Sequence, residues 1–380
     1  MLKLVCFNLT EKASLYIHIP FCSSKCDYCD FYSIAAGSLS DEDIDTILLT
    51  LVKNIKHQID YFNVKEIPSV YIGGGTPSVL GRKISVLINA LNNIENFSPQ
   101  EFTIEANPES VTEEFLEICR EGGVNRLSLG VQTFHEPSRI AVNRGRKLNN
   151  NKNIILASKY FPESLSVDLI AGLPFQDEKV IAEDIKRILD FNPAHVSLYS
   201  LTVEDGTPLK EKIKTKSVTL PPGDLADSLW LTGKDALLKE GFEHYEISNF
   251  AKPGKRSLHN IRYWLMKNWI GVGPSASGTV INENTGTAVR YTYDNDVFSA
   301  KSVCEELDKK TLLKESLLMG YRYVEGPDLQ LFRQRFGRGV EDCIPQTMAR
   351  WVNKDKMLFL NAFLTEAFEE LEGQLSMTQS

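Results

Sequence analysis

Apolar residues in the first 200 positions follow two alternating patterns. Short, nearly continuous apolar runs are separated by longer stretches in which apolar residues recur three or four positions apart, as in Ile44, Ile47, Leu48 and Leu51. A short continuous run is typical of a buried strand, whereas the longer spacing is typical of an amphipathic helix. The predicted strands cover residues 15–19, 69–72, 102–105, 126–129, 165–170 and 195–199.

Helices are predicted between these strands, and three of them begin at residues suited to capping. Ser40 or Asp41 can cap the first helix, Thr112 opens another, and Asp177 can cap a third. The predicted helices cover residues 41–62, 82–94, 112–121, a region that ends near 160, and 177–189. Six strand–helix alternations indicate parallel strands covered by helices, so we predict an α/β fold, a partial (β/α)6 TIM-like barrel. In such barrels the functional residues lie where the strands end.

The pattern changes after about residue 207. A helix is predicted over residues 221–239, turns over 271–278, and a linker over 286–293. Further helices are predicted over 310–323, 327–336, 343–352 and 364–372, with a short hairpin near 357–361. We therefore predict a core domain over residues 1–290 and a small, mainly α, winged-helix-like C-terminal domain over residues 291–380.

The overall composition excludes several classes of protein. The 380 residues are 42% hydrophobic and 24% charged, as in a soluble globular protein. A net charge of −8 gives no general attraction for nucleic acid. No apolar run reaches transmembrane length and the first residues do not resemble a signal peptide, so at most peripheral membrane contact is expected. Seven mostly scattered cysteines favour a reducing compartment, and we predict a cytoplasmic protein.

Three cysteines are not scattered. Cys22, Cys26 and Cys29 form a C-x3-C-x2-C array directly after the first predicted strand. Three thiolates on one loop can hold three irons of a [4Fe-4S] cluster and leave the fourth iron open for chemistry. Two alternatives remain: a zinc site with His18 as fourth ligand, or free buried thiols. The other cysteines (Cys6, Cys119, Cys304 and Cys343) are expected to be buried small residues.

Polar residues and glycines occupy the other strand ends. A Gly-rich turn at residues 73–77 allows the backbone to approach a ligand closely. Glu105 and Asp168 can bind the hydroxyl or ammonium groups of a ligand, or they can simply lie at a solvated rim. Gln132 and Arg144 can hold further polar groups of a nucleotide or lie at the surface.

His259 and Tyr263 are four residues apart and share a face if they lie on a helix. Both side chains can ligate haem iron, and Trp264 can stack on a macrocycle. The alternative is that His259 and Tyr263 only pack a domain junction.

Taken together, these motifs resemble the HemW-like branch of the oxygen-independent coproporphyrinogen III oxidase (HemN-like) radical SAM family. The resemblance rests on motifs that occur in order: YIHIPFC at 16–22, GGGTP at 73–77, IEANP at 104–108, GVNRLSLGVQ at 123–132, DLIAGLP at 168–174 and HNIRYW at 259–264. It implies a [4Fe-4S] cluster on the three cysteines and S-adenosylmethionine (SAM) on the open iron. The SAM contacts that it implies are Tyr16, Gly74, Gly75, Thr76, Glu105, Gln132, Arg144, Asp168, Ser200 and Ala276. Tyr28, beside Cys29, is also expected to contact the cofactors. Together with Phe31, it can shield a cluster from water.

The resemblance also implies a function. The HemW-like branch consists of haem chaperones, which bind haem and pass it to acceptor haemoproteins such as respiratory enzymes, and its His-Asn-x-x-Tyr-Trp motif places His259 at haem. The oxidases have a fourth cysteine where this chain has Phe31, and a longer segment before the cysteine loop than the 21 residues found here. Relatives often have His where this chain has Ser277. Oxidative decarboxylation of coproporphyrinogen III and a non-catalytic, cluster-regulated binding function remain alternatives. The haem acceptor, the electron donor, SAM cleavage and homodimer formation are left open by the sequence.

Overall fold

A single large sheet organises the molecule. The computed structural model describes residues 11–145 and 151–377. Its twelve-stranded sheet has the order β14-β13-β12-β11-β1-β4-β5-β6-β7-β8-β10-β9. The six predicted strands are β1 (Ser14–Ile19), β4 (Ser69–Gly74), β5 (Glu101–Ala106), β6 (Arg126–Gln132), β7 (Leu165–Ala171) and β8 (His195–Ser200). They lie side by side in chain order and are all parallel, which confirms the predicted partial barrel.

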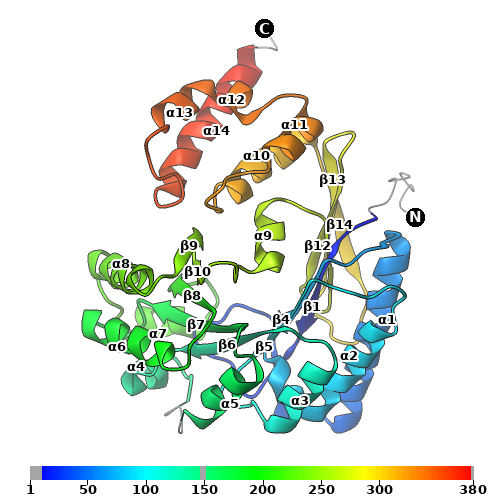
Figure 1. The fold of residues 1–380 in the computed structure, drawn as a ribbon, viewed down its shortest axis with the longest axis vertical. Helices are drawn as coiled ribbons and strands as arrows, with labels where there is room; N and C mark the ends of the chain where they lie inside the picture. Colours follow the sequence, from blue (N-terminus) through cyan, green and yellow to red (C-terminus); the bar gives the residue numbers. More distant parts are fainter. Residues whose placement is uncertain (1–10, 146–150, 378–380) are drawn as a thin grey trace.

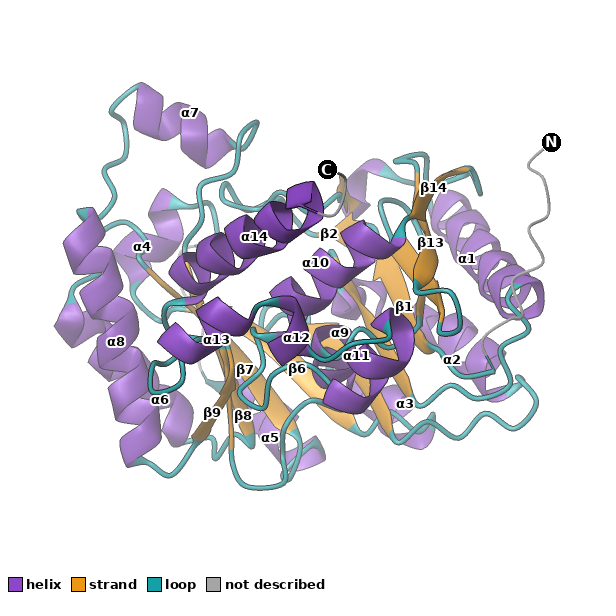
Figure 2. Cartoon of the chain, turned by 90° about the horizontal axis from the view of Figure 1, so that it is seen from above, coloured by secondary structure: helices purple, strands orange, loops and turns teal. Residues whose placement is uncertain are grey.

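Helices cover the outer face of these strands (Figures 1 and 2). They are α1 (Asp41–Tyr61), α2 (Ile84–Asn92) after the 3-10 segment Pro77–Lys83, α3 (Glu113–Glu121), α4 (Glu136–Ala141), α5 (Lys152–Tyr160) and α6 (Glu178–Leu189). Ser40, Thr112 and Asp177 cap α1, α3 and α6, because each side chain accepts a hydrogen bond from the backbone N–H three residues later. The strands are buried on both faces, which explains their continuous apolar runs.

Further strands extend the sheet at both edges. On one side lie β11 (Trp269–Val272), β12 (Ser277–Asn282), β13 (Thr287–Tyr293) and β14 (Ser302–Leu307), and on the other β10 (Asn249–Ala251) and β9 (Glu243–Glu246). β11 pairs parallel to β1, and the others pair antiparallel to their neighbours. The prediction of a linker over 286–293 is therefore wrong. Residues 287–293 form β13, whose backbone groups pair with β12 and β14 on its two sides.

The remaining helices follow β8 in the chain. α7 (Pro208–Lys214), α8 (Gly223–Lys239) and α9 (Leu258–Trp264) precede the last strands. The C-terminal helices α10 (Lys309–Gly320), α11 (Leu329–Phe336), α12 (Val340–Cys343), α13 (Pro345–Arg350) and α14 (Leu360–Met377) stack beyond α9 in Figure 1 and overlie the sheet in Figure 2. The hairpin predicted near 357–361 is absent from the described residues, where a turn leads into α14.

Two hydrophobic clusters divide the core. The larger joins the barrel strands to their covering helices, and the smaller joins α10–α14 to the end of the β12–β13 hairpin. The division at residue 290 stays a prediction, and that residue lies inside β13. Cys119 and Cys343 are buried as predicted, whereas Cys304 is exposed because it lies on the edge strand β14; Cys6 lies outside the described residues. Within the described residues, no helix combines the length and apolarity needed to cross a bilayer.

Candidate functional site

The cysteine loop begins where β1 ends. Cys22 closes the short strand β2 (Phe21–Cys22), and a turn brings the Cys29 N–H to within 3.1 Å of the Cys26 carbonyl oxygen. Cys22 Sγ lies 3.5 Å from Thr76 Oγ1, and Arg144 Nη1 donates to Cys26 Sγ at 3.3 Å. The loop therefore faces the Gly-rich turn after β4 and a cation from the segment after α4.

The three thiols are free, and the surroundings of Cys29 disfavour its unliganded thiolate. Burial raises the pKa of Cys29 to about 11, so a bound metal centre would have to displace its proton. Among the described residues, no three His, Cys, Asp or Glu side chains converge closely enough for one metal ion. A single zinc ion needs such convergence, whereas a [4Fe-4S] cluster takes one thiolate per iron. His18, the fourth ligand that zinc would need, has both ring nitrogens in hydrogen bonds, to the Tyr16 hydroxyl at 3.0 Å and the Tyr32 carbonyl at 2.9 Å, so the donor set suits a cluster better than zinc.

A cavity of about 340 Å³ opens beside this loop. Its walls come from the ends of successive parallel strands, as the fold class predicts. The predicted site residues that line it are Cys22, Cys26, Tyr28, Cys29, Gly74, Gly75, Thr76, Glu105, Gln132, Arg144 and Asp168. Phe31 also lines the cavity, but its side chain is 60% exposed, which makes it a poor shield against water.

Two carboxylates share this cavity. Glu105 accepts hydrogen bonds from the Tyr71 hydroxyl at 2.7 Å and from the Gly74 N–H at 3.1 Å. Asp168 accepts one from the Ser128 hydroxyl at 3.0 Å. Burial raises the pKa of Glu105 to about 7 and also raises the pKa of Asp168. Both carboxylates would be stabilised by a cationic ligand, and the ammonium and sulfonium groups of SAM meet this requirement.

Arg144 and Gln132 bring further polar groups to the cavity. Arg144 Nη2 donates to Asn107 Oδ1 at 2.7 Å and to the Gly130 carbonyl at 2.6 Å. Gln132 lies at a bulge in β6 with φ of 68°, and its Oε1 is buried without a hydrogen-bond partner among the described residues. Buried polar atoms are normally paired, so the free oxygen fits a cavity that receives a polar ligand.

The Gly-rich turn depends on its glycines. Gly74 has φ of 103°, and a Cβ there would lie 2.5 Å from the His18 ring. A Cβ on Gly75 would lie 2.5 Å from the Phe21 carbonyl oxygen and 2.7 Å from that of Ile19. Both positions therefore exclude a side chain, and the turn packs directly on the start of the cysteine loop.

Three predicted SAM contacts lie outside this lining. Tyr16 is on β1, where its hydroxyl is 3.0 Å from His18 Nδ1. Ala276 is buried next to β12, and Ser200 faces a different cavity. Their assignment as SAM contacts stays a prediction. Ser277 lies on β12, where its hydroxyl is hydrogen-bonded to the Thr292 hydroxyl at 2.8 Å. It belongs to neither cavity lining.

Sequence reasoning missed Asn107, Tyr71 and Ser128. Asn107 connects two walls, because its Nδ2 donates to Thr76 Oγ1 at 3.0 Å while its Oδ1 accepts from Arg144. Its position directly after β5 is the signal that could have found it. Tyr71 and Ser128 lie within strands, and only the sheet shows that they support Glu105 and Asp168.

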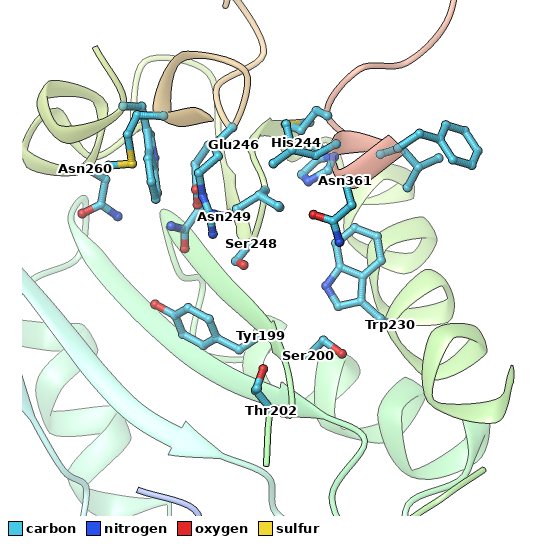
Figure 3. Close-up of a pocket in the computed structure, with 18 of the residues that line it drawn as sticks. Tyr199, Ser200, Thr202, Trp230, His244, Glu246, Ser248, Asn249, Asn260 and Asn361 are labelled. Carbon is cyan, nitrogen blue, oxygen red and sulfur yellow. The ribbon is translucent and has the colours of Figure 1, made fainter. Parts of the chain in front are cut away.

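A larger cavity, of about 1130 Å³, lies between the barrel and the C-terminal helices. Figure 3 shows side chains from the end of β8, from α8, from β9 and from the start of α14 facing it. Its polar lining residues include His244, Glu246, Asn249, Asn260, Arg322 and Asn361, and its apolar ones include Trp230, Trp264, Met319, Met357 and Phe359. Tyr199 lines both cavities, so the two spaces meet at this ring.

The two predicted haem residues are placed differently. Tyr263 lines the larger cavity. His259 does not: it is 2% exposed, and its Nδ1 lies 3.0 Å from the hydroxyl of Ser69 in β4. Its ring is 5.0 Å from that of Tyr263, and burial lowers its pKa to about 3. His259 therefore connects α9 to the barrel, behind the cavity wall.

Comparisons with known proteins agree with this architecture. Residues 16–191 match the model of the Radical SAM superfamily. The protein named heme chaperone HemW of Lactococcus lactis subsp. lactis (strain IL1403) is 32% identical over 358 residues, which cover 92% of this chain and 92% of the relative. The heme chaperone HemW of Bacillus subtilis (strain 168) is 31% identical and covers 88% of this chain and 90% of its own length.

A solved structure is similar over nearly the whole chain. Coproporphyrinogen III oxidase (HemN) from Escherichia coli, described as a radical SAM enzyme, matches with a TM-score of 0.74 and covers 94% of this chain and 90% of that chain. At 20% identity, this match shows the shared fold alone.

Proposed function

This chain belongs to the HemW family of radical SAM proteins, and we propose on that premise that it binds haem and passes it to acceptor haemoproteins. The observation that carries the proposal is the match to relatives named heme chaperone HemW, which extends over 92% of both chains. At that coverage the match extends beyond the barrel strands. A cavity of about 1130 Å³ with aromatic walls and a few polar groups has the size and character of a site for a large planar ligand.

The smaller cavity is proposed to hold the cluster and SAM. Cys22, Cys26 and Cys29 would each bind one iron of a [4Fe-4S] cluster. Glu105 and Asp168 would face the cationic groups of SAM, and Arg144 its carboxylate. With both groups bound, the site would supply an open iron for one-electron chemistry on SAM. The charges and the unpaired Gln132 Oε1 support this assignment.

We also propose the division into a core at 1–290 and a C-terminal domain at 291–380, and a cytoplasmic location. The same hypothesis includes three partners: respiratory haemoproteins that accept the haem, an electron donor for the cluster, and a second copy of the chain in a homodimer.

The direct test is haem transfer. The anaerobically reconstituted full chain is titrated with haemin, then mixed with an apo-haemoprotein. We expect a Soret shift on binding and movement of that band to the acceptor. The same preparation, given coproporphyrinogen III, SAM in excess and a reductant, is expected to form no protoporphyrinogen. Absence of haem binding contradicts the chaperone function, and turnover of coproporphyrinogen supports the oxidase.

A further inference from the structure

Asn107 lies between two of the three loop cysteines in a chain of hydrogen bonds. It follows β5 directly and lines the smaller cavity. On one side, its Nδ2 is 3.0 Å from Thr76 Oγ1, which in turn lies 3.5 Å from Cys22 Sγ. On the other side, its Oδ1 is 2.7 Å from Arg144 Nη2, and Nη1 of the same guanidinium is 3.3 Å from Cys26 Sγ. A single amide therefore connects Cys22 to Cys26.

The guanidinium of Arg144 fixes the direction of these hydrogen bonds. A guanidinium can only donate, so the atom of Asn107 that faces it must be the amide oxygen. The amide nitrogen then faces Thr76 and donates to its hydroxyl oxygen. Because that oxygen already accepts a hydrogen bond, the hydroxyl proton is free to donate to the Cys22 sulfur, which as a thiolate can only accept. Both ends of the chain thus direct a donor at a cysteine sulfur.

The backbone of Asn107 is held on both sides. Its N–H donates to the Ser78 hydroxyl at 3.1 Å, and its carbonyl accepts from the N–H groups of Ser110 and Val111 at 3.0 and 3.1 Å. Its side chain packs against Gly130, where a Cβ would lie 2.9 Å from the Asn107 Oδ1. An amide held in this way presents its oxygen and nitrogen in fixed directions, which preorganises the groups that it bonds.

Donors directed at cluster sulfurs change how readily a cluster takes up an electron. Reduction adds negative charge to the sulfurs, so hydrogen bonds to them become stronger in the reduced state. Such bonds therefore raise the reduction potential of an iron–sulfur cluster.

We propose that Asn107 is a positioning residue: it directs the Thr76 hydroxyl and the Arg144 guanidinium at two cluster thiolates and so raises the reduction potential of the cluster. The inference rests on the proposed [4Fe-4S] site. It goes beyond that site by assigning a residue that controls the potential without binding iron.

The test measures the reduction potential of the anaerobically reconstituted full chain, without SAM, by redox titration followed with electron paramagnetic resonance. Asn107→Ala should shift the midpoint to a more negative potential, because neither donor keeps its direction. Asn93→Ala is the matched control, at an exposed position at the end of α2, and should keep the wild-type potential. Iron and sulfide content of the same samples ensures that equal clusters are compared.

Thr76→Val distinguishes the hydrogen-bond chain from a local packing effect. It keeps the shape of the side chain but removes the hydroxyl that donates to Cys22, so it should also lower the potential. If Asn107 acts through Thr76, the shift in the double variant should be smaller than the sum of the two single shifts. Additive shifts would mean that Asn107 acts by another route, and they would overturn the inference.

Failure of the inference and failure of the proposed function give different results. If the wild-type protein forms no [4Fe-4S] cluster, the cluster assignment fails and the inference with it. If the wild-type protein forms the cluster and Asn107→Ala has the same potential, the inference is wrong and the cluster assignment stands.

A second variant covers the case in which Asn107→Ala does not fold or takes up no cluster. Asn107→Asp keeps the shape of the side chain and the acceptor for Arg144, but it cannot donate to Thr76. Its potential should also be more negative than that of the wild-type protein, and an unchanged potential would contradict the inference.

Discussion

At the scale of single residues, the smaller cavity is governed by the environment of its carboxylates. No ion pair joins Glu105 or Asp168 to a cation among the described residues, and burial raises the pKa of Asp168 even though its hydrogen bonds and the charge of Arg144 oppose the shift. For Glu105, burial outweighs the hydrogen bonds from Tyr71 and Gly74. Its ionisation is therefore unfavourable until a cationic ligand enters.

This environment predicts a pH dependence of stability in the ligand-free protein. With a pKa of about 7 instead of 4.5, folded Glu105 holds a proton between these values that the unfolded chain lacks. Its contribution to the unfolding free energy therefore falls as the pH rises through this window, by on the order of 3 kcal/mol in total. Glu105→Gln should remove that contribution.

Urea denaturation at pH 5 and pH 8 measures the effect. The stability lost between the two pH values should be smaller in Glu105→Gln than in wild type. Glu95→Gln, at an exposed position, should lose as much as wild type. Equal losses in all three proteins would contradict the raised pKa.

At the scale of elements, close backbone contacts join the cysteine loop to the barrel. The Gly75 N–H donates to the Ile19 carbonyl at 2.7 Å, and the Thr76 N–H donates to that of Phe21 at 2.6 Å. The turn after β4 thus holds the start of the loop by main-chain hydrogen bonds, and a side chain at Gly75 would force them apart.

Gly75→Ala should therefore damage both stability and cluster assembly. We expect a loss of about 1–3 kcal/mol in unfolding free energy, typical of overpacking against a backbone that cannot move away. Iron and sulfide content after anaerobic reconstitution should fall as well. Gly37→Ala is the control, because a Cβ there meets nothing within 4 Å. Similar behaviour of the two variants would show that the contact is unimportant.

Arg139 joins β6, α4 and the segment that carries Arg144. It is fully buried and donates to the carbonyls of Val131 and Thr133, both at 3.0 Å, and to that of Arg144 at 2.8 Å. It also pairs with Glu109. Removing it would leave several acceptors without a donor.

Arg139→Ala should lower the unfolding free energy by about 3 kcal/mol or more. The matched comparison is Arg82→Ala, which breaks the Arg–Glu pair with Glu114 on the surface, where the Arg82 side chain is 78% exposed. That change should cost far less, because water screens the exposed pair. Urea denaturation checks both, and comparable losses would refute the difference in burial as the cause.

At the scale of the whole molecule, the two cavities adjoin but are built from different parts. The smaller uses the ends of β4–β7 and the cysteine loop, whereas the larger uses β8, β9, α8, α9 and the C-terminal helices. Tyr199 is the one residue common to the two linings. We therefore expect haem binding and cluster assembly to be separable.

Cys22→Ala should lose the [4Fe-4S] cluster and keep its affinity for haem within about twofold, since Cys22 is absent from the lining of the larger cavity and does not contact it through Tyr199 in any hydrogen bond of the described residues. Iron and sulfide analysis and haemin titration measure the two properties on one preparation. A large loss of haem affinity in this variant would mean that the cluster loop shapes the larger cavity. A full cluster in Cys22→Ala would overturn the assignment of the cysteines.

The sequence by itself determined the barrel and most of the smaller cavity. Apolar runs that alternate with amphipathic helices in the sequence predict parallel strands. The parallel arrangement then brings the ends of these strands to one rim of the barrel. Cys22, Glu105 and Asp168 could therefore be placed together before any coordinates were known. Strand β13 was not predicted, although its Thr, Val and Tyr residues are common in strands, and its pairing with β12 and β14 shows that it lies inside the sheet.

The larger cavity was decided by tertiary structure alone. Its lining comes from segments near residues 199, 230, 245, 262, 320 and 359. No local sequence pattern predicts that these segments lie together in the fold. For the same reason, the sequence motif indicated His259, whereas the packing of α9 buries that ring behind the cavity wall. Spacing along the chain predicts which residues share an element, but only the packing of elements decides which side chains face a ligand.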